Sequence, residues 1–118
     1  IGEYMNFNQY QEYAEQFDLF AQEKYKASDP AFMAKVLGLV GEAGETAEKF
    51  KKILRDKAGE ISEEDKLEIL KELGDVLWYI ATITRYLGAD FQTVADMNIK
   101  KLSKRLEDNK LHESGDNR

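Results

Sequence analysis

Apolar residues recur at steps of three and four along nearly the whole chain, and this spacing places them on one face of a helix. The pattern is interrupted at residues 28–29, 58–61 and 88–90, where small and acidic residues gather. No stretch alternates apolar and polar residues as a half-buried strand does. We therefore predict an all-α fold, a four-helix antiparallel bundle, with helices over about residues 6–27, 30–57, 63–87 and 91–108.

Local signals mark the ends of several of these helices. Asp29 and Pro30 predict a helix start, because an aspartate caps free amides and proline needs no amide partner at the first helical position. Ser62 and Asp65 have the spacing of a capping box. Gly88 suits the left-handed residue that often follows a helix, so we expect the third helix to end there.

The 118 residues suffice for one domain, which we assign to residues 5–108, followed by a disordered polar tail over residues 109–118. The chain carries 17 basic and 23 acidic residues, a net charge of −6, so we expect no binding to nucleic acid or to a membrane surface. No window approaches the roughly 20 apolar residues of a membrane span. The first residues show no signal-peptide pattern, and the expected location is cytoplasmic.

Residue types limit the chemistry that this chain can perform. There is no cysteine, and the only histidine, His112, lies in the polar tail. Thiol nucleophiles, serine–histidine triads and cysteine-bound zinc sites are therefore excluded. Carboxylates, amines, guanidinium groups and phenols remain.

Four acidic residues form two pairs with the same spacing. Glu42 and Glu45 are three residues apart in the second predicted helix, and Glu72 and Asp75 are three residues apart in the third. Each pair projects from one side of its helix, so two antiparallel helices would aim all four carboxylates into one cleft. Like charges in a cleft repel unless a cation binds them, and an all-oxygen ligand set favours Mg²⁺ or Mn²⁺. Most other acidic residues are expected on solvated helix faces.

Glycines and a tyrosine accompany the carboxylates. Gly38 and Gly41 precede the first pair by one turn, and they either leave room for ions and phosphate or permit close contact between helices. Close helix contact is the expectation for Gly44 and Gly74. Tyr79 follows the second pair by one turn, where its phenol can donate to a phosphate or stack on a sugar or base.

The fourth predicted helix carries a polar stripe of Asn98, Lys101 and Arg105. Amide, ammonium and guanidinium groups together suit an anionic ligand, although the same stripe is also typical of an ordinary solvated face. Four large apolar residues exceed what one small core needs and favour a subunit interface: Phe20, Phe32, Trp78 and Tyr86.

Three motifs together resemble a known family. They are Gly-Leu-Val-Gly-Glu-Ala-Gly-Glu over 38–45, Lys-Glu-Leu-Gly-Asp-Val-Leu-Trp-Tyr over 71–79 and Asn-x-x-Lys-Leu-x-x-Arg over 98–105. In these motifs the chain resembles the MazG-like nucleotide pyrophosphohydrolases of the all-α NTP pyrophosphatase superfamily, over about residues 32–106. The resemblance implies Mg²⁺-dependent hydrolysis of nucleoside triphosphates between the α and β phosphorus atoms. It also implies a homodimer or homotetramer in which partner helices complete the pocket.

By this resemblance each motif residue has an expected role. The Mg²⁺ ligands would be Glu42, Glu45, Glu72 and Asp75, the phosphate contacts Lys101 and Arg105, and the residues lining the nucleotide pocket Tyr79 and Asn98. We assign to Glu45 the catalytic role of orienting or deprotonating the attacking water. Two alternatives stay open: hydrolysis of another pyrophosphate-containing nucleotide such as phosphoribosyl-ATP, and a non-enzymatic acidic helical adaptor. Base and sugar preference also stay open.

Overall fold

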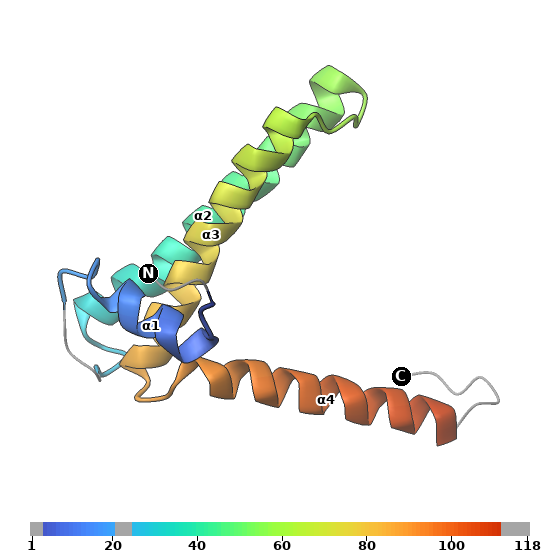
Figure 1. Cartoon of the computed structure of the whole chain (residues 1–118). Helices are drawn as coiled ribbons and strands as arrows, with labels where there is room; N and C mark the ends of the chain where they lie inside the picture. The colour runs from blue at the N-terminus through green and yellow to red at the C-terminus, as the bar shows by residue number, and fades with distance from the viewer. Residues whose placement is uncertain (1–3, 21–24, 112–118) are drawn as a thin grey trace.

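The computed structural model describes residues 4–20 and 25–111 and contains four helices (Figure 1). They are α1 (Phe7–Glu15), α2 (Pro30–Lys57), α3 (Glu63–Tyr86) and α4 (Phe91–Leu111). No strand occurs in the two described ranges, and the predicted all-α fold class is confirmed. None of these helices combines the length and the apolar content that crossing a membrane requires.

The predicted helix ends agree well with the structure. Ser62 accepts a hydrogen bond from the Asp65 amide at 3.0 Å, and the Asp65 carboxylate accepts from the Ser62 amide at 3.1 Å, which completes the capping box. Gly88 has the expected left-handed backbone, with φ of 78°. Asp29 is the N-cap residue of α2, but its carboxylate accepts from the Lys26 amide at 2.8 Å instead of from a helix amide.

The first helix is shorter than predicted. α1 ends at Glu15, so the prediction of a helix to residue 27 is wrong over residues 16–20 and 25–27, and residues 21–24 of it lie outside the described ranges. Beyond the helix the chain turns, which exposes Phe17 and buries Asp18. The Asp18 carboxylate accepts the Phe20 amide at 3.0 Å, and such local hydrogen bonds compete with continuation of a helix.

The helices form two arms that meet at α1 (Figure 1). α2 and α3 pack side by side as the expected antiparallel pair, and α4 extends away from them. In the described chain α4 contacts α1 and α3 but not α2. It continues to Leu111, so residues 109–111 of the predicted tail are helical, and residues 112–118 lie outside the described part. The all-α architecture is therefore open within one chain.

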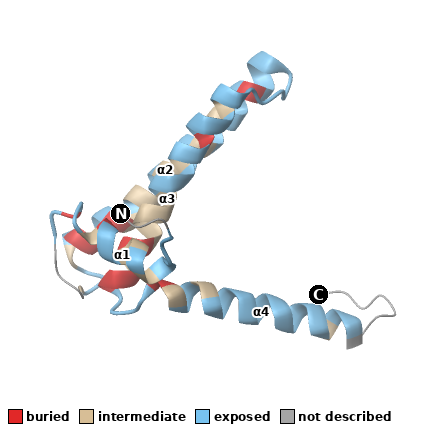
Figure 2. Ribbon diagram, viewed as in Figure 1, coloured by how far each residue is buried: buried red, intermediate tan, exposed pale blue. Residues whose placement is uncertain are grey.

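The core lies where the two arms meet (Figure 2). Phe32 and Tyr86 are only 7% and 0% exposed, because their rings pack edge to face with centroids 5.6 Å apart. The prediction that they serve a subunit interface is wrong. Many apolar side chains of the outer arms are exposed instead, among them Val40, Leu54, Leu70, Leu73, Met97, Ile99, Leu102 and Leu106. One chain thus leaves much of its apolar helix surface uncovered.

A buried ionic cluster joins the turn after α1 to α2 and α3. The Asp18 carboxylate lies 3.2 Å from the Lys35 ammonium and accepts hydrogen bonds from the Arg85 guanidinium and, at 2.6 Å, from the Tyr86 hydroxyl. Burial raises the pKa of this carboxyl, but hydrogen bonds from Tyr86, a backbone amide and Lys35 outweigh burial and hold the pKa below its ordinary value. These contacts fasten the turn to α2 and α3.

Candidate metal centre

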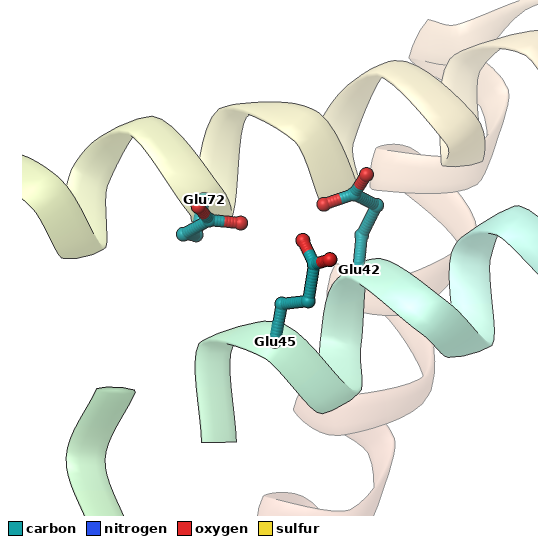
Figure 3. Close-up of side chains that lie close together, drawn as sticks. All are labelled: Glu42, Glu45 and Glu72. Atoms are coloured by element: carbon teal, nitrogen blue, oxygen red, sulfur yellow. The ribbon is translucent and has the colours of Figure 1, made fainter. Parts of the chain in front are cut away.

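α2 and α3 bring three carboxylates together near the middle of the long arm (Figure 3). Glu42 and Glu45 project from α2 and Glu72 projects from α3, and one oxygen of each lies within 4.8 Å of the others. The two α2 side chains share one side of the helix because they are three residues apart. Three of the four predicted metal ligands therefore lie in one cluster.

The carboxylates of this cluster lack hydrogen-bond partners for some of their oxygens, and their negative charges lie close together. Glu42 and Glu72 each have one buried carboxylate oxygen with no hydrogen-bond partner among the described residues. Burial, a hydrogen bond with Glu45 and the charges of the neighbouring carboxylates raise the pKa of Glu42 to about 7. Both the unpartnered oxygens and the crowded charges cost free energy. A divalent cation would remove both costs, and these oxygen donors suit Mg²⁺ or Mn²⁺.

Asp75, the fourth predicted ligand, lies beside this cluster. Its side chain is exposed, and it does not belong to the group of three. Its negative charge still contributes to the raised pKa of Glu42. The pKa of Tyr10 on α1 is raised by burial and, to a smaller extent, by the same Asp75 charge. Asp75 is therefore close enough to act electrostatically on a cation in the cluster.

Tyr79 packs against α2 at Gly38. A Cβ atom on Gly38 would lie 2.8 Å from the Tyr79 hydroxyl oxygen and still closer to two ring carbons, so close helix contact explains this glycine. At Gly41 the same Cβ position meets no described atom within 4 Å, which agrees with open space beside the cluster. Gly44 and Gly74 are equally open, so the close contact predicted for them is not made within the described chain.

Two lysines that the motifs did not indicate lie next to the carboxylates. The Lys49 Nζ is 4.0 Å from Glu72 Oε1. A cavity of about 280 Å³ is lined by Lys49 and Lys52 together with Glu45, Glu48 and Glu72. The lysines follow Glu45 at four and seven residues, which keeps them on the carboxylate side of α2. This spacing is visible in the sequence, but it is equally typical of a solvated helix face.

The predicted substrate residues of α4 lie elsewhere. Asn98 and Lys101 line a cavity of about 430 Å³ with two apolar residues of the same helix. Arg105 is exposed further along α4. Because α4 does not contact α2 in the described chain, one copy of the protein does not bring these side chains to the carboxylate cluster.

The fold and the cluster define an all-helical protein with a group of three carboxylates that could hold a hard cation. The chain matches the MazG nucleotide pyrophosphohydrolase domain over residues 32–109, which include all three clustered glutamates. The protein therefore belongs to the MazG family. It is similar to the Gene 37 protein of Mycobacterium phage L5, with 49% identity over 82 residues that cover 70% of this chain and 72% of the phage protein. No solved structure matches it.

Proposed function

We propose that this protein is a Mg²⁺-dependent pyrophosphohydrolase that cleaves (deoxy)nucleoside triphosphates to a monophosphate and pyrophosphate. The observation that carries the proposal is the cluster of Glu42, Glu45 and Glu72, whose oxygens lie within 4.8 Å of one another. Membership of a family of nucleotide pyrophosphohydrolases supports it. Three carboxylates alone would repel a polyanionic substrate, so a cation between them is part of the proposal.

The clustered residues divide the chemistry between them. Glu42 and Glu72, each with an unpartnered buried oxygen, hold the ion together with Glu45, and Asp75 adds negative charge beside them. When bound, Mg²⁺ neutralises phosphate charge and lowers the pKa of water. Glu45, more exposed than the other two, accepts a proton from the attacking water. The water oxygen bonds to the α phosphorus, the bond to the α–β bridging oxygen breaks, and pyrophosphate leaves.

Tyr79 is the proposed contact for the nucleoside half of the substrate. Its ring is half-buried and held against Gly38, and it packs edge to face on Trp78 with centroids 5.0 Å apart. A ring held by two neighbours presents a fixed surface for a sugar or base. The open space at Gly41 lies between this ring and the carboxylates along α2.

A second copy of the chain completes the pocket in this proposal. Asn98, Lys101 and Arg105 lie on α4, which does not reach α2 in one described chain. The same helix exposes an apolar stripe of Ile99, Leu102 and Leu106 next to these polar residues. Covering such a face is favourable at about 25 cal/mol per Å² of apolar surface. We therefore propose a homodimer or homotetramer in which α4 of one copy supplies amide, ammonium and guanidinium groups to the phosphates at the partner's carboxylates.

Release of pyrophosphate tests the activity. The assay compares canonical and modified triphosphates and phosphoribosyl-ATP, each with and without Mg²⁺. We expect release that requires Mg²⁺ and that Glu72→Gln lowers by at least about 100-fold, because loss of even an outer-shell partner of a metal costs up to that much. Glu64→Gln, exposed near the start of α3, is the matched control and should keep full activity. Absence of metal-dependent release from every substrate would overturn the proposal and favour the adaptor alternative.

Mixing two inactive variants tests the role of the second copy. Glu72→Gln removes a carboxylate and Arg105→Ala removes a guanidinium group, so neither variant alone has an intact pocket. If α4 acts across the subunit interface, mixed oligomers regain one intact pocket and activity returns. If the mixture stays inactive while light scattering shows that mixed oligomers form, α4 does not act in the partner's pocket.

A further inference from the structure

The carboxylate side of α2 changes charge along its length. Glu42 and Glu45 are followed by Lys49 and Lys52 at steps of four and three, so all four side chains lie on one side of the helix. At about 1.5 Å per residue, the lysines lie about 6 Å and about 10 Å beyond Glu45 along the axis. One cavity joins both lysines to Glu45 and Glu72. The cluster therefore has a positively charged neighbour on the side of the α2–α3 loop.

The ammonium groups of these two lysines are weakly engaged. The Lys49 Nζ is 4.0 Å from Glu72 Oε1, which is longer than a hydrogen bond, and its side chain is 34% exposed. Lys52 makes no ion pair with any residue in the described ranges. By contrast, Lys57 donates to both Asp65 carboxylate oxygens at 2.8 Å. Lys49 and Lys52 thus retain donors for an anion.

The other side of the cluster has a different character. Lys35 lies two turns before Glu42 on the same side of α2, but it is buried and its ammonium is paired with Asp18 at 3.2 Å. Between Lys35 and Glu42 the Tyr79 ring fills the space at Gly38. The face shared by α2 and α3 is therefore aromatic toward α1. Toward the α2–α3 loop it first presents Lys49 and Lys52, and the acidic side chains of Asp56, Asp65 and Glu68 line the cavity beyond them.

We propose that Lys49 and Lys52 bind the β- and γ-phosphoryl groups, so that the triphosphate lies along α2 with its nucleoside toward Tyr79. This assignment rests on the proposed function and adds the direction in which the substrate lies. Once the glutamates hold a cation, their charge no longer retains Lys49 at Glu72. The two ammonium groups then donate charge-assisted hydrogen bonds to phosphate oxygens and neutralise the charge that grows on the leaving pyrophosphate.

Binding of inorganic pyrophosphate, measured by calorimetry on the full chain in excess Mg²⁺, tests this assignment without turnover. We expect Lys49→Gln and Lys52→Gln each to weaken pyrophosphate binding about tenfold, the value of one charged hydrogen bond. Binding of the nucleoside monophosphate product should not change, because it lacks the groups that the lysines contact. Lys51→Gln is the matched control, since Lys51 lies on the opposite side of α2 and pairs with Glu48 at 3.8 Å.

The outcomes separate this inference from the proposed function. Unchanged pyrophosphate affinity in both lysine variants overturns the inference, and so does equal weakening of pyrophosphate and monophosphate binding. Neither result affects the proposed function if the wild-type chain releases pyrophosphate from a triphosphate. A wild-type chain that releases none overturns the proposed function and this inference together.

Discussion

Asp18→Asn tests whether the buried ionic cluster holds the junction of the two arms together. The Asp18 side chain is fully enclosed, and the side chains of Lys35 and Arg85 are only 10% and 7% exposed. Asparagine keeps the shape and still accepts from the Tyr86 hydroxyl, but it removes the negative charge that both cations face. Removing one partner of a buried ion pair costs about 3–5 kcal/mol, because a charge is left buried without compensation.

Thermal unfolding followed by circular dichroism measures this loss. For a chain of this size we expect a fall in melting temperature of about 10–20 °C at pH 7, compared at equal protein concentration because assembly also shifts the value. Asp56→Asn, which removes an exposed pair with Arg55, should change little. The pKa of Asp18 is lowered by folding, so its contribution is complete above the unfolded value of 3.8 and is lost as the pH falls below it. Wild type and Asp18→Asn should therefore converge in acid.

A melting temperature within about 3 °C of wild type at pH 7 would refute this reasoning, because it corresponds to less than about 1 kcal/mol. The double variant Asp18→Asn with Lys35→Met separates a lost charge pair from a packing defect. Methionine removes the ammonium group that is left behind, so we expect part of the lost stability to return. A further fall in melting temperature in the double variant would indicate that a packing defect, and not the lost charge pair, causes the destabilisation.

The carboxylate cluster and the glycines beside it lead to further expected outcomes. Folding raises the pKa of Glu42 from 4.5 to about 7, so its contribution to the unfolding free energy of the metal-free protein is lost as the pH rises across that range, and Glu42→Gln should remove this slope. Mg²⁺ must displace the proton that Glu42 carries below this pKa. It should therefore raise the melting temperature more at pH 8 than at pH 6, and equal rises would contradict this. In urea unfolding, Gly41→Ala should raise the free energy of unfolding by about 1 kcal/mol, because open space surrounds Gly41 and alanine favours the helix. Gly38→Ala should instead lower the free energy of unfolding by about 1–2 kcal/mol, because the alanine Cβ would meet the Tyr79 ring. Equal effects of the two substitutions would argue against that contact.

Predictions that depend on groups a few residues apart were accurate. α2 begins at Pro30 and ends at Lys57 as predicted, and α3 begins directly after the Ser62 cap. Helix caps are made by side chains and amides within about four residues, so the sequence is enough to locate them. Local spacing does not predict the end of α1, because that end depends on Asp18, whose partners on α3 lie 67 and 68 residues further along the chain.

The site was predictable in its chemistry and only in part in its geometry. Helix spacing places Glu42 and Glu45 on one side of α2, but the rotation of α3 decides which of its carboxylates meets them. That rotation depends on packing with α1, where the Trp78 indole donates to the Ala14 carbonyl at 3.0 Å. Glu72 enters the cluster and Asp75 remains exposed beside it.

By itself the sequence determined four helical segments, a set of candidate ligands made of oxygen, and a chain with no cysteine and a single histidine. These properties follow from residue types and from hydrogen bonds between near neighbours. Only the tertiary structure decided which oxygens meet, where Lys49 and Lys52 stand relative to them, and that α4 points away from α2. The physical reason is that such contacts join distant segments, and their geometry depends on how the side chains at the junction of the helices pack.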